Sequence, residues 1–165
     1  MDLSYLKAAE GTCPPADLPL SPFSEFFNEY KNRKLERPDL LIKLGMVAYG
    51  RGGDGVDVHA LDEALFNAGV EVGDLKLAEA CLARLKKKFP DSVRVGVLEG
   101  KYLECTDQHA KALVLYDVLL GKNMASLPVM KRKVCVFKAQ GKMVKAAEEL
   151  QVCTNNKCFL IFVYL

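Results

Sequence analysis

Three alanines recur in this chain at a constant interval, since Ala78, Ala112 and Ala146 lie 34 residues apart. Two further sets of residues keep the same period. Turn-forming residues stand five positions before the alanines and large side chains stand four positions after them: Gly73, Asp107 and Gly141, then Leu82, Tyr116 and Leu150. A fixed period that several residue classes share predicts a stack of repeated structural units, and it constrains the fold more strongly than any local signal.

The length of the period indicates what the unit is. A unit of 34 residues is typical of the tetratricopeptide repeat, a helix-turn-helix pair. Each pair has an apolar face that it cannot cover alone, and stacking on the next pair buries that face. We expect small side chains where two paired helices cross, namely the periodic alanines and Gly100, although Phe66 and Val134 stand at the position of Gly100 in the other pairs. The large periodic residues then fill the space between pairs.

Apolar periodicity and the placing of proline and glycine predict eight helices. Their ranges are 22–36, 38–50, 59–71, 75–89, 93–105, 109–121, 128–140 and 143–151. Asp74 is expected to cap the helix that follows the Gly73 turn. The predicted fold class is therefore all-α, a tetratricopeptide-type helical-hairpin solenoid with an irregular N-terminal segment and a non-repeat C-terminal tail.

The predicted domain boundaries follow from these helices. Residues 1–21 are expected to be largely disordered, and residues 152–165 to form an irregular apolar tail. The helical repeat domain covers residues 22–151, with repeats at about 59–92, 93–126 and 127–151. The apolar stretch 159–165 is expected either to pack back on the third repeat or to promote aggregation.

Composition excludes several classes of protein. The 23 basic and 21 acidic residues are too evenly balanced for nucleic acid to be the main partner. No apolar run approaches the roughly 20 residues that span a bilayer, and the N-terminus does not read as a secretory signal, so we expect the chain on the cytosolic side. Cys81, Cys105 and Cys135 fall in predicted helices and are expected to be free thiols among apolar neighbours.

No motif predicts catalysis, a cofactor or a metal. His59 and His109 are far apart and lack neighbours of metal-ligand type, and no second pair completes a zinc site with Cys153 and Cys158. The stretch Gly50–Gly55 fits the glycine pattern of a dinucleotide site, but such a site needs a strand before it, and here a helix precedes it. We therefore expect a non-catalytic protein.

Two sets of basic residues are candidates for binding a partner. The 34-residue register places the inner-face positions of the first helices at Glu63, Asn67, Arg94, Val97, Lys101, Lys131, Cys135 and Lys138. This surface is mixed in the first repeat and basic in the next two, which favours an acidic peptide or helix; ordinary solvated charge is the alternative. The predicted partner-binding residues are Arg94, Lys101, Lys131, Arg132 and Lys138.

A second cluster consists of Arg84, Lys86, Lys87 and Lys88. Cations at the end of a helix suit the helix dipole, so a solvated face explains the cluster. Contact with anionic lipid or an acidic partner stays open. A clamp for chaperone tails is not favoured, because only Asn67 and Arg132 fit its register.

Three stretches carry a resemblance to a known family: LAEACLARLKKKFPDSVRV, ALVLYDVLL and KRKVCVFKAQGKMVKAAEEL. They are similar to subunit 2 of the endoplasmic-reticulum membrane protein complex, over about residues 38–150. The resemblance implies a peripheral scaffold on the cytoplasmic side of the endoplasmic reticulum. Such a subunit joins membrane-embedded subunits to cytosolic ones, in an assembly that inserts transmembrane segments into the membrane.

The chain departs from the family at its end. Family members continue with further helical repeats, whereas this chain stops at Leu165, so we expect a C-terminally truncated or alternatively spliced form. An array lacking later repeats and a polar cap is expected to be less stable than a complete one. The residues alone leave a second hypothesis open, a free-standing tetratricopeptide adaptor that binds acidic peptides or helices in its basic inner groove.

Overall fold

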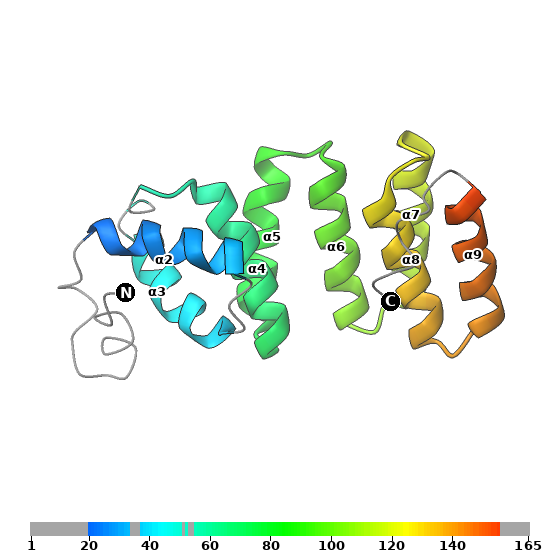
Figure 1. Ribbon diagram of the computed structural model, residues 1–165, viewed down its shortest axis with the longest axis horizontal. Helices are drawn as coiled ribbons and strands as arrows, with labels where there is room; N and C mark the ends of the chain where they lie inside the picture. Colours follow the sequence, from blue (N-terminus) through cyan, green and yellow to red (C-terminus); the bar gives the residue numbers. More distant parts are fainter. Residues whose placement is uncertain (1–19, 34–36, 51, 53–54, 156–165) are drawn as a thin grey trace. The chain divides into compact units, whose positions relative to one another are not determined.

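The computed structural model describes residues 20–33, 37–50, 52 and 55–155. Within them, every regular element is an α-helix, so the predicted all-α class is confirmed (Figure 1). The helices are α2 (Leu20–Arg33), α3 (Pro38–Gly50), α4 (Val58–Val72), α5 (Leu75–Lys88), α6 (Val93–Cys105), α7 (His109–Lys122), α8 (Leu127–Ala139) and α9 (Met143–Asn155). The expectations for residues 1–19 and 156–165 lie outside the described residues. Leu20 and Ser21, which we had placed in the disordered N-terminal segment, belong to α2.

Most helix ends agree with the sequence prediction to within two residues. The clear difference is α9, which we expected to stop at residue 151 and which continues to Asn155. Residues 152–155 are therefore helical, and the prediction of an irregular tail from residue 152 was wrong for them. The physical reason is that Val-Cys-Thr-Asn contains neither glycine nor proline, so nothing in it breaks a helix.

The periodic turns have a common backbone geometry. Gly73, Asp107 and Gly141 all have positive φ, at 86°, 59° and 71°. Residues in this left-handed conformation end helices, and glycine adopts it without steric cost. The predicted cap is confirmed, since the backbone N–H of Leu77 donates to the Asp74 carboxylate at 3.1 Å. The 34-residue period thus corresponds to one recurring turn in the chain.

Contacts divide the chain into two compact units, Met1–Lys88 and Phe89–Leu165. In the first unit, α2 packs on α3, α3 on α4, and α4 on α5. Phe23 and Phe27 of α2 are buried, with ring centroids 6.0 Å apart.

Helices α4 and α5 approach each other closely at Gly69. A Cβ atom there would lie 3.1 Å from the Asp74 carbonyl oxygen and 3.6 Å from the Cβ of Ala78. A small residue thus stands at a close approach of α4 to α5 at Gly69, one turn beyond Phe66, the large residue that occupies the position equivalent to Gly100.

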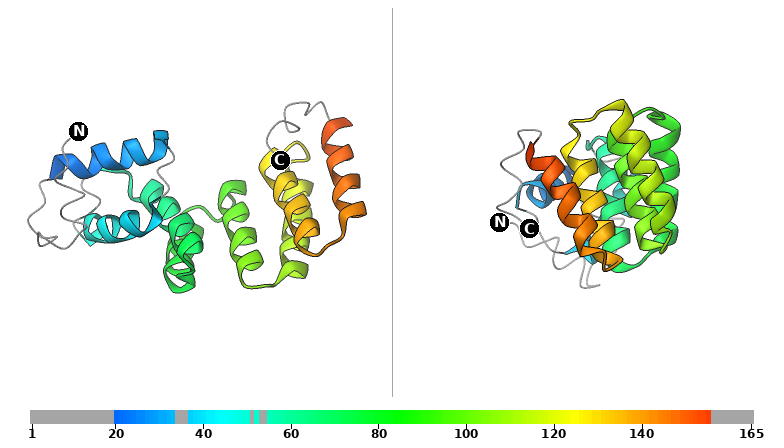
Figure 2. Two further views of the ribbon diagram at one scale, coloured as in Figure 1. Left: turned by 60° about the horizontal axis from the view of Figure 1, so that its bottom comes forward. Right: turned by 90° about the vertical axis from the view of Figure 1, so that its right-hand side faces the viewer.

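In the second unit, α6 packs on α7, α8 lies against both, and α9 packs on α8 (Figure 2). Its core is built from the apolar faces of α7 and α8, and contains Ala112, Tyr116, Leu119, Val129 and Val136. A Cβ atom on Gly100 would overlap the ring of Tyr116, so α6 and α7 approach closely at the position where the sequence places a glycine.

Candidate partner-binding site

Helix α8 carries an unusual concentration of one charge. Its thirteen residues include Lys131, Arg132, Lys133 and Lys138, and no aspartate or glutamate. These four cations fall into two classes, because two of them are bound by carboxylates of neighbouring helices and the other two lie on an exposed stripe.

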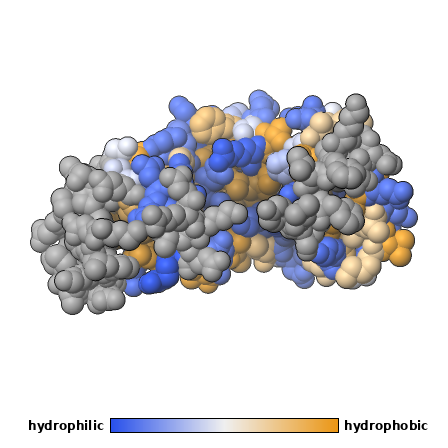
Figure 3. All heavy atoms as spheres, in the orientation of Figure 1, coloured by the Kyte–Doolittle hydropathy of each residue, from blue (hydrophilic) through white to orange (hydrophobic). Residues whose placement is uncertain are grey.

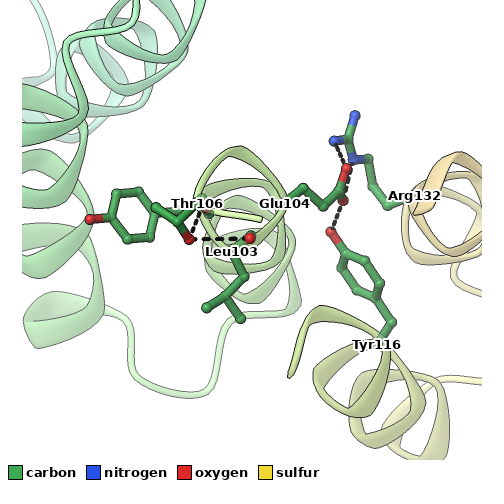
Figure 4. A network of polar contacts seen from close by, with 6 residues as sticks. Leu103, Glu104, Thr106, Tyr116 and Arg132 are labelled. Atoms are coloured by element: carbon green, nitrogen blue, oxygen red, sulfur yellow. Dashed lines mark hydrogen bonds and ion pairs between the residues drawn. The ribbon is translucent and has the colours of Figure 1, made fainter. Parts of the chain in front are cut away.

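Arg132 belongs to the first class and is part of a three-helix network (Figure 4). Its Nε donates to Oε1 of Glu104 on α6 at 3.1 Å, and its Nη2 pairs with Oε2 of the same carboxylate. Tyr116 of α7 donates from its hydroxyl to Oε1 of Glu104 at 2.5 Å. One carboxylate therefore joins α6, α7 and α8.

The network is largely shielded from water. Tyr116 is fully buried, and the side chains of Glu104 and Arg132 are 12% and 30% exposed. Burial, followed by the hydrogen bond to Glu104, raises the pKa of Tyr116 well above its ordinary value. Burial alone would lower the pKa of Arg132, but the bond and charge of Glu104 outweigh it and raise that pKa. Arg132, a predicted partner-binding residue, is thus engaged inside the unit.

Lys133, the next residue of α8, is also held by carboxylates of neighbouring helices. Its Nζ lies 2.9 Å from Asp117 of α7 and 2.7 Å from Glu149 of α9, and its side chain is 15% exposed. Burial acts to lower the pKa of Lys133, and the two carboxylates reverse that effect and raise it. These ion pairs of Lys133 join α7, α8 and α9.

Lys131 and Lys138 form the second class. Both are exposed, and Cys135 between them is half-buried. The spacing of four and three residues puts all three on one stripe of the helix. Two other predicted partner-binding residues stand on α6, where Arg94 is exposed and Lys101 is half-buried; both also interact within the chain.

The surface around the two units is mixed in character. In the view of Figure 3, hydrophilic and apolar residues are interspersed over the described part of the face rather than gathered in one apolar area. Whether the predicted partner-binding residues bind a partner stays a prediction.

The residues predicted to pack the repeats lie as follows. Ala78, Ala112 and Ala146 are buried, with exposed fractions of 0%, 0% and 4%. Leu82 and Tyr116 are also buried, and Leu150 is half-buried. Gly100 is buried against Tyr116, whereas Gly73 and Gly141 are exposed in the turns.

The first unit has a buried ion pair of its own. Asp62 of α4 is 1% exposed and accepts from Nε and Nη2 of Arg84 at 2.9 and 2.6 Å. The guanidinium also lies 4.6 Å from the ring centroid of Tyr49. We had grouped Arg84 with the solvated lysines 86–88; those lysines are exposed, but Arg84 turns inward, and its bond to Asp62 raises its pKa.

Sequence reasoning missed the carboxylates that make these pairs: Asp62, Glu104, Asp117 and Glu149. Glu104 and Arg132 are 28 residues apart, which is no helical spacing and marks no contact. A weak signal exists for Asp62, because it stands next to Leu61 and three residues before Leu65 on the apolar side of α4. A charged residue at such a position requires a partner.

Other kinds of site have little support. Among the described residues, no group of three or more His, Cys, Asp or Glu side chains could hold a metal ion. Cys81, Cys105 and Cys135 are free thiols, and burial raises the pKa of Cys81 to about 11. In the part of the chain that the structure describes, we find no helix with the length and apolarity to cross a membrane.

Comparison with known proteins gives one consistent result. No family model matches the chain. Subunit 2-B of the ER membrane protein complex from Xenopus laevis is 34% identical over 96 residues, which is 58% of this chain and 32% of that protein. Subunit 2 from Dictyostelium discoideum is 30% identical over 124 residues, which is 73% of this chain and 38% of that protein. The TPR repeat protein oca3 of Schizosaccharomyces pombe is 28% identical over 88 residues, which is 53% of this chain and 31% of that protein.

These relatives agree with the fold and with the resemblance found in the sequence. The repeat protein from fission yeast supports the tetratricopeptide-type helical-hairpin fold. The matches to the other proteins span about a third of the length of each. Over that part, the chain is a relative of the subunit 2 proteins of the endoplasmic-reticulum membrane protein complex.

Proposed function

We propose that this protein is a non-catalytic scaffold subunit of an endoplasmic-reticulum membrane protein complex. It lies on the cytoplasmic side, associates with the membrane through other subunits, and supports the insertion of transmembrane proteins. Its partners are the remaining subunits of that complex. The observation that carries this proposal is the similarity to subunit 2 proteins from Xenopus and Dictyostelium, at 34% and 30% identity.

The structure is consistent with this role. Stacked helix pairs present extended faces on which other proteins dock. In the described part of the chain, no group of three or more His, Cys, Asp or Glu side chains could hold a metal ion. The charged residues inside the units serve packing: Glu104, Asp62 and Lys133 each bind side chains of other helices. The exposed cations of α8 are left for contacts with partners.

The proposal is tested by affinity purification of the tagged chain from membranes solubilised in mild detergent. Mass spectrometry should recover other subunits of the complex in amounts comparable with the bait. As a matched control, the Gly100→Ala variant should lose them, since its Cβ would overlap Tyr116 and disturb the second unit. Recovery of the bait alone from folded wild-type chain would contradict the proposal.

A second candidate is a free-standing adaptor that binds acidic peptides or helices. It is favoured by Lys131 and Lys138, which are exposed on one stripe of α8. The two candidates differ in the state of the protein in the cell, because an adaptor exchanges partners and a scaffold subunit stays assembled. A stable complex through gel filtration of the detergent extract supports the scaffold.

A further inference from the structure

The start of α9 carries an exposed patch in which apolar and basic side chains alternate. Lys142, Met143, Val144 and Lys145 are consecutive and all exposed, with exposed fractions of 61% for Met143 and 73% for Val144. Single apolar residues are common on protein surfaces, but here two large ones stand side by side between two cations. We call these four residues the basic-apolar patch. Packing between the helices does not require their side chains to be of this kind.

The backbone holds the patch in a fixed place. Gly141 has a φ of 71°, and its N–H donates to the Lys138 carbonyl at 3.0 Å. The N–H of Lys142 donates to the Phe137 carbonyl at 2.9 Å. Together these bonds form a Schellman motif, which ends α8 and reverses the chain. Because Cβ atoms tilt toward the N-terminus of a helix, the side chains of the first turn of α9 project toward that end of the helix.

The stability of α9 does not explain the two lysines. The N-terminus of a helix carries a partial positive charge, so a cation there is unfavourable and a carboxylate is favourable. The first turn of α9 contains no acidic residue, and within the described residues no carboxylate forms an ion pair with Lys142 or Lys145. Lys86, Lys87 and Lys88 differ, because they stand in the last turn of α5, where the dipole favours them. The fold thus leaves the charge of the patch uncompensated.

Neighbouring residues keep this end of the second unit positive. The α6–α7 turn lies at the same end (Figure 1). Its exposed carboxylate, that of Asp107, lies 3.2 Å from Nε2 of His109, and the exposed Lys111 follows one turn later. Lys138 is a further exposed cation in the last turn of α8, and Glu148 stands one turn further along α9, away from this end. An anionic surface that approaches the patch therefore meets mostly cations.

A lipid surface matches both halves of the patch. Lysines close to an anionic bilayer are attracted by its head groups, and their apolar stems let the charge stay at that level while the backbone lies close by. Exposed apolar side chains of interfacial segments enter the boundary between head groups and acyl chains. A specific protein interface takes roughly 20–30 residues on each side, many more than this tip provides. A bilayer needs no matched surface, and a small contact adds to the attachment of a chain that partners already hold.

We propose that the basic-apolar patch of Lys142, Met143, Val144 and Lys145 contacts an anionic phospholipid surface directly. The lysines lie among the head-group anions, and Met143 and Val144 enter the boundary with the acyl chains. One such tip binds weakly by itself, since stable attachment to a bilayer takes more than one signal. The inference goes beyond the proposed function, in which other subunits supply the membrane association, and adds a contact that orients the chain against the bilayer.

Tryptophan fluorescence tests the insertion, because the chain contains no tryptophan. Val144→Trp places a single reporter in the patch, with Met143→Trp as a second one. Met124→Trp places it in the α7–α8 connection, at a side chain that is 76% exposed. Vesicles of phosphatidylcholine with phosphatidylserine should shift the emission of both patch reporters to the blue and protect them from acrylamide. The Met124→Trp emission should stay unchanged, and vesicles of phosphatidylcholine alone should shift none of the three.

Flotation of the purified full chain with the same vesicles measures the part played by the lysines. Lys142→Gln with Lys145→Gln should weaken binding to the anionic vesicles at least about tenfold, since each lysine near such a surface contributes about fivefold. Lys87→Gln with Lys88→Gln removes the same charge from the end of α5 and should stay within about twofold of the wild type.

The apolar half of the patch is tested in the same assay. Met143→Gln with Val144→Gln keeps the charge and should weaken binding about tenfold through the lost insertion. Met124→Gln, the matched change at the α7–α8 connection, should have no effect. Raising the salt concentration should weaken binding of the wild type by screening the lysines. Circular dichroism should show all variants folded.

Four results would overturn the inference: no binding of the wild type to anionic vesicles, equal binding to phosphatidylcholine alone, equal spectral shifts at Val144 and Met124, or equal losses in the two lysine variants. Capture on immobilised polyglutamate that the Lys142 and Lys145 variant loses, with vesicle binding unchanged, would assign the patch to an acidic protein instead. Failure here leaves recovery of complex subunits by affinity purification unchanged, whereas failure of the proposed function leaves vesicle binding unchanged. The two outcomes are therefore distinguishable.

Discussion

Replacing Glu104 with alanine should destabilise the second unit more than any surface substitution. The change removes the single acceptor that Tyr116 and Arg132 share. The Tyr116 hydroxyl would remain buried without a partner, which costs about 1–3 kcal/mol. A fully buried charge stripped of its partner costs roughly 3–5 kcal/mol, but Arg132 is 30% exposed and water can solvate part of it, so we assign about 1 kcal/mol.

The expected loss in the free energy of unfolding is therefore about 2–4 kcal/mol, a large part of the roughly 5–15 kcal/mol of a typical domain. Glu104→Gln should lose less, about 1–2 kcal/mol, because the amide oxygen still accepts the tyrosine hydrogen bond while the charge pairing with Arg132 is lost.

Urea unfolding followed by far-ultraviolet circular dichroism measures these losses. Glu148→Ala is the matched control, since Glu148 is an exposed glutamate on α9, and it should change stability by less than about 0.5 kcal/mol. If Glu104→Ala is no more destabilising than Glu148→Ala, the network around Glu104 does not stabilise the second unit. A larger loss for Glu104→Gln than for Glu104→Ala would also contradict this role of Glu104.

Three further predictions concern stability. Gly100→Ala should lower the free energy of unfolding by about 1–3 kcal/mol, because the new Cβ overlaps Tyr116. A Cβ added at Gly121 meets nothing within 4 Å, so Gly121→Ala should raise the free energy of unfolding by up to about 1 kcal/mol; equal effects of the two variants in urea unfolding would contradict this. Asp107→Gly should raise stability by about 1 kcal/mol by relieving a left-handed conformation, and Gly141→Ala should lower it; the opposite order of unfolding midpoints would refute the turn assignment. Stability should fall between about pH 9 and pH 11, because the buried Cys81 thiol keeps its proton up to a pKa of about 11, whereas the thiol of the unfolded chain loses its proton earlier; the stabilisation from Cys81 is therefore complete below this window and is lost as the pH rises through it. Cys81→Ala should flatten this pH dependence in urea titrations, and an unchanged slope would contradict the assignment to Cys81.

The sequence predicted the features that a period can encode. The recurring turn at Gly73, Asp107 and Gly141 follows from its spacing, because each residue must adopt or tolerate positive φ. The close approach of α4 to α5 at Gly69 was not predicted, because a period specifies which positions are equivalent and not how closely two helices approach there.

The internal ion pairs could not be predicted in this way. Arg132 stands within a run of three basic residues, and such runs are usually solvated. Its pairing with Glu104 depends on the separation of α6 and α8 and on the reach of two long side chains, neither of which has a period. Lys131 and Lys138 were predicted from register to lie on one face of α8, but register did not predict that Arg132 and Lys133 are paired inside the unit.

Under the proposed function, this chain works as an assembled part of a membrane protein complex. Sedimentation of a detergent extract through a density gradient, with quantitative detection of the chain and of a membrane-embedded subunit in every fraction, tests it most directly. The account predicts that the two profiles coincide in a fast-sedimenting peak. A chain found only in the slow fractions, while the membrane-embedded subunit sediments fast, would contradict it.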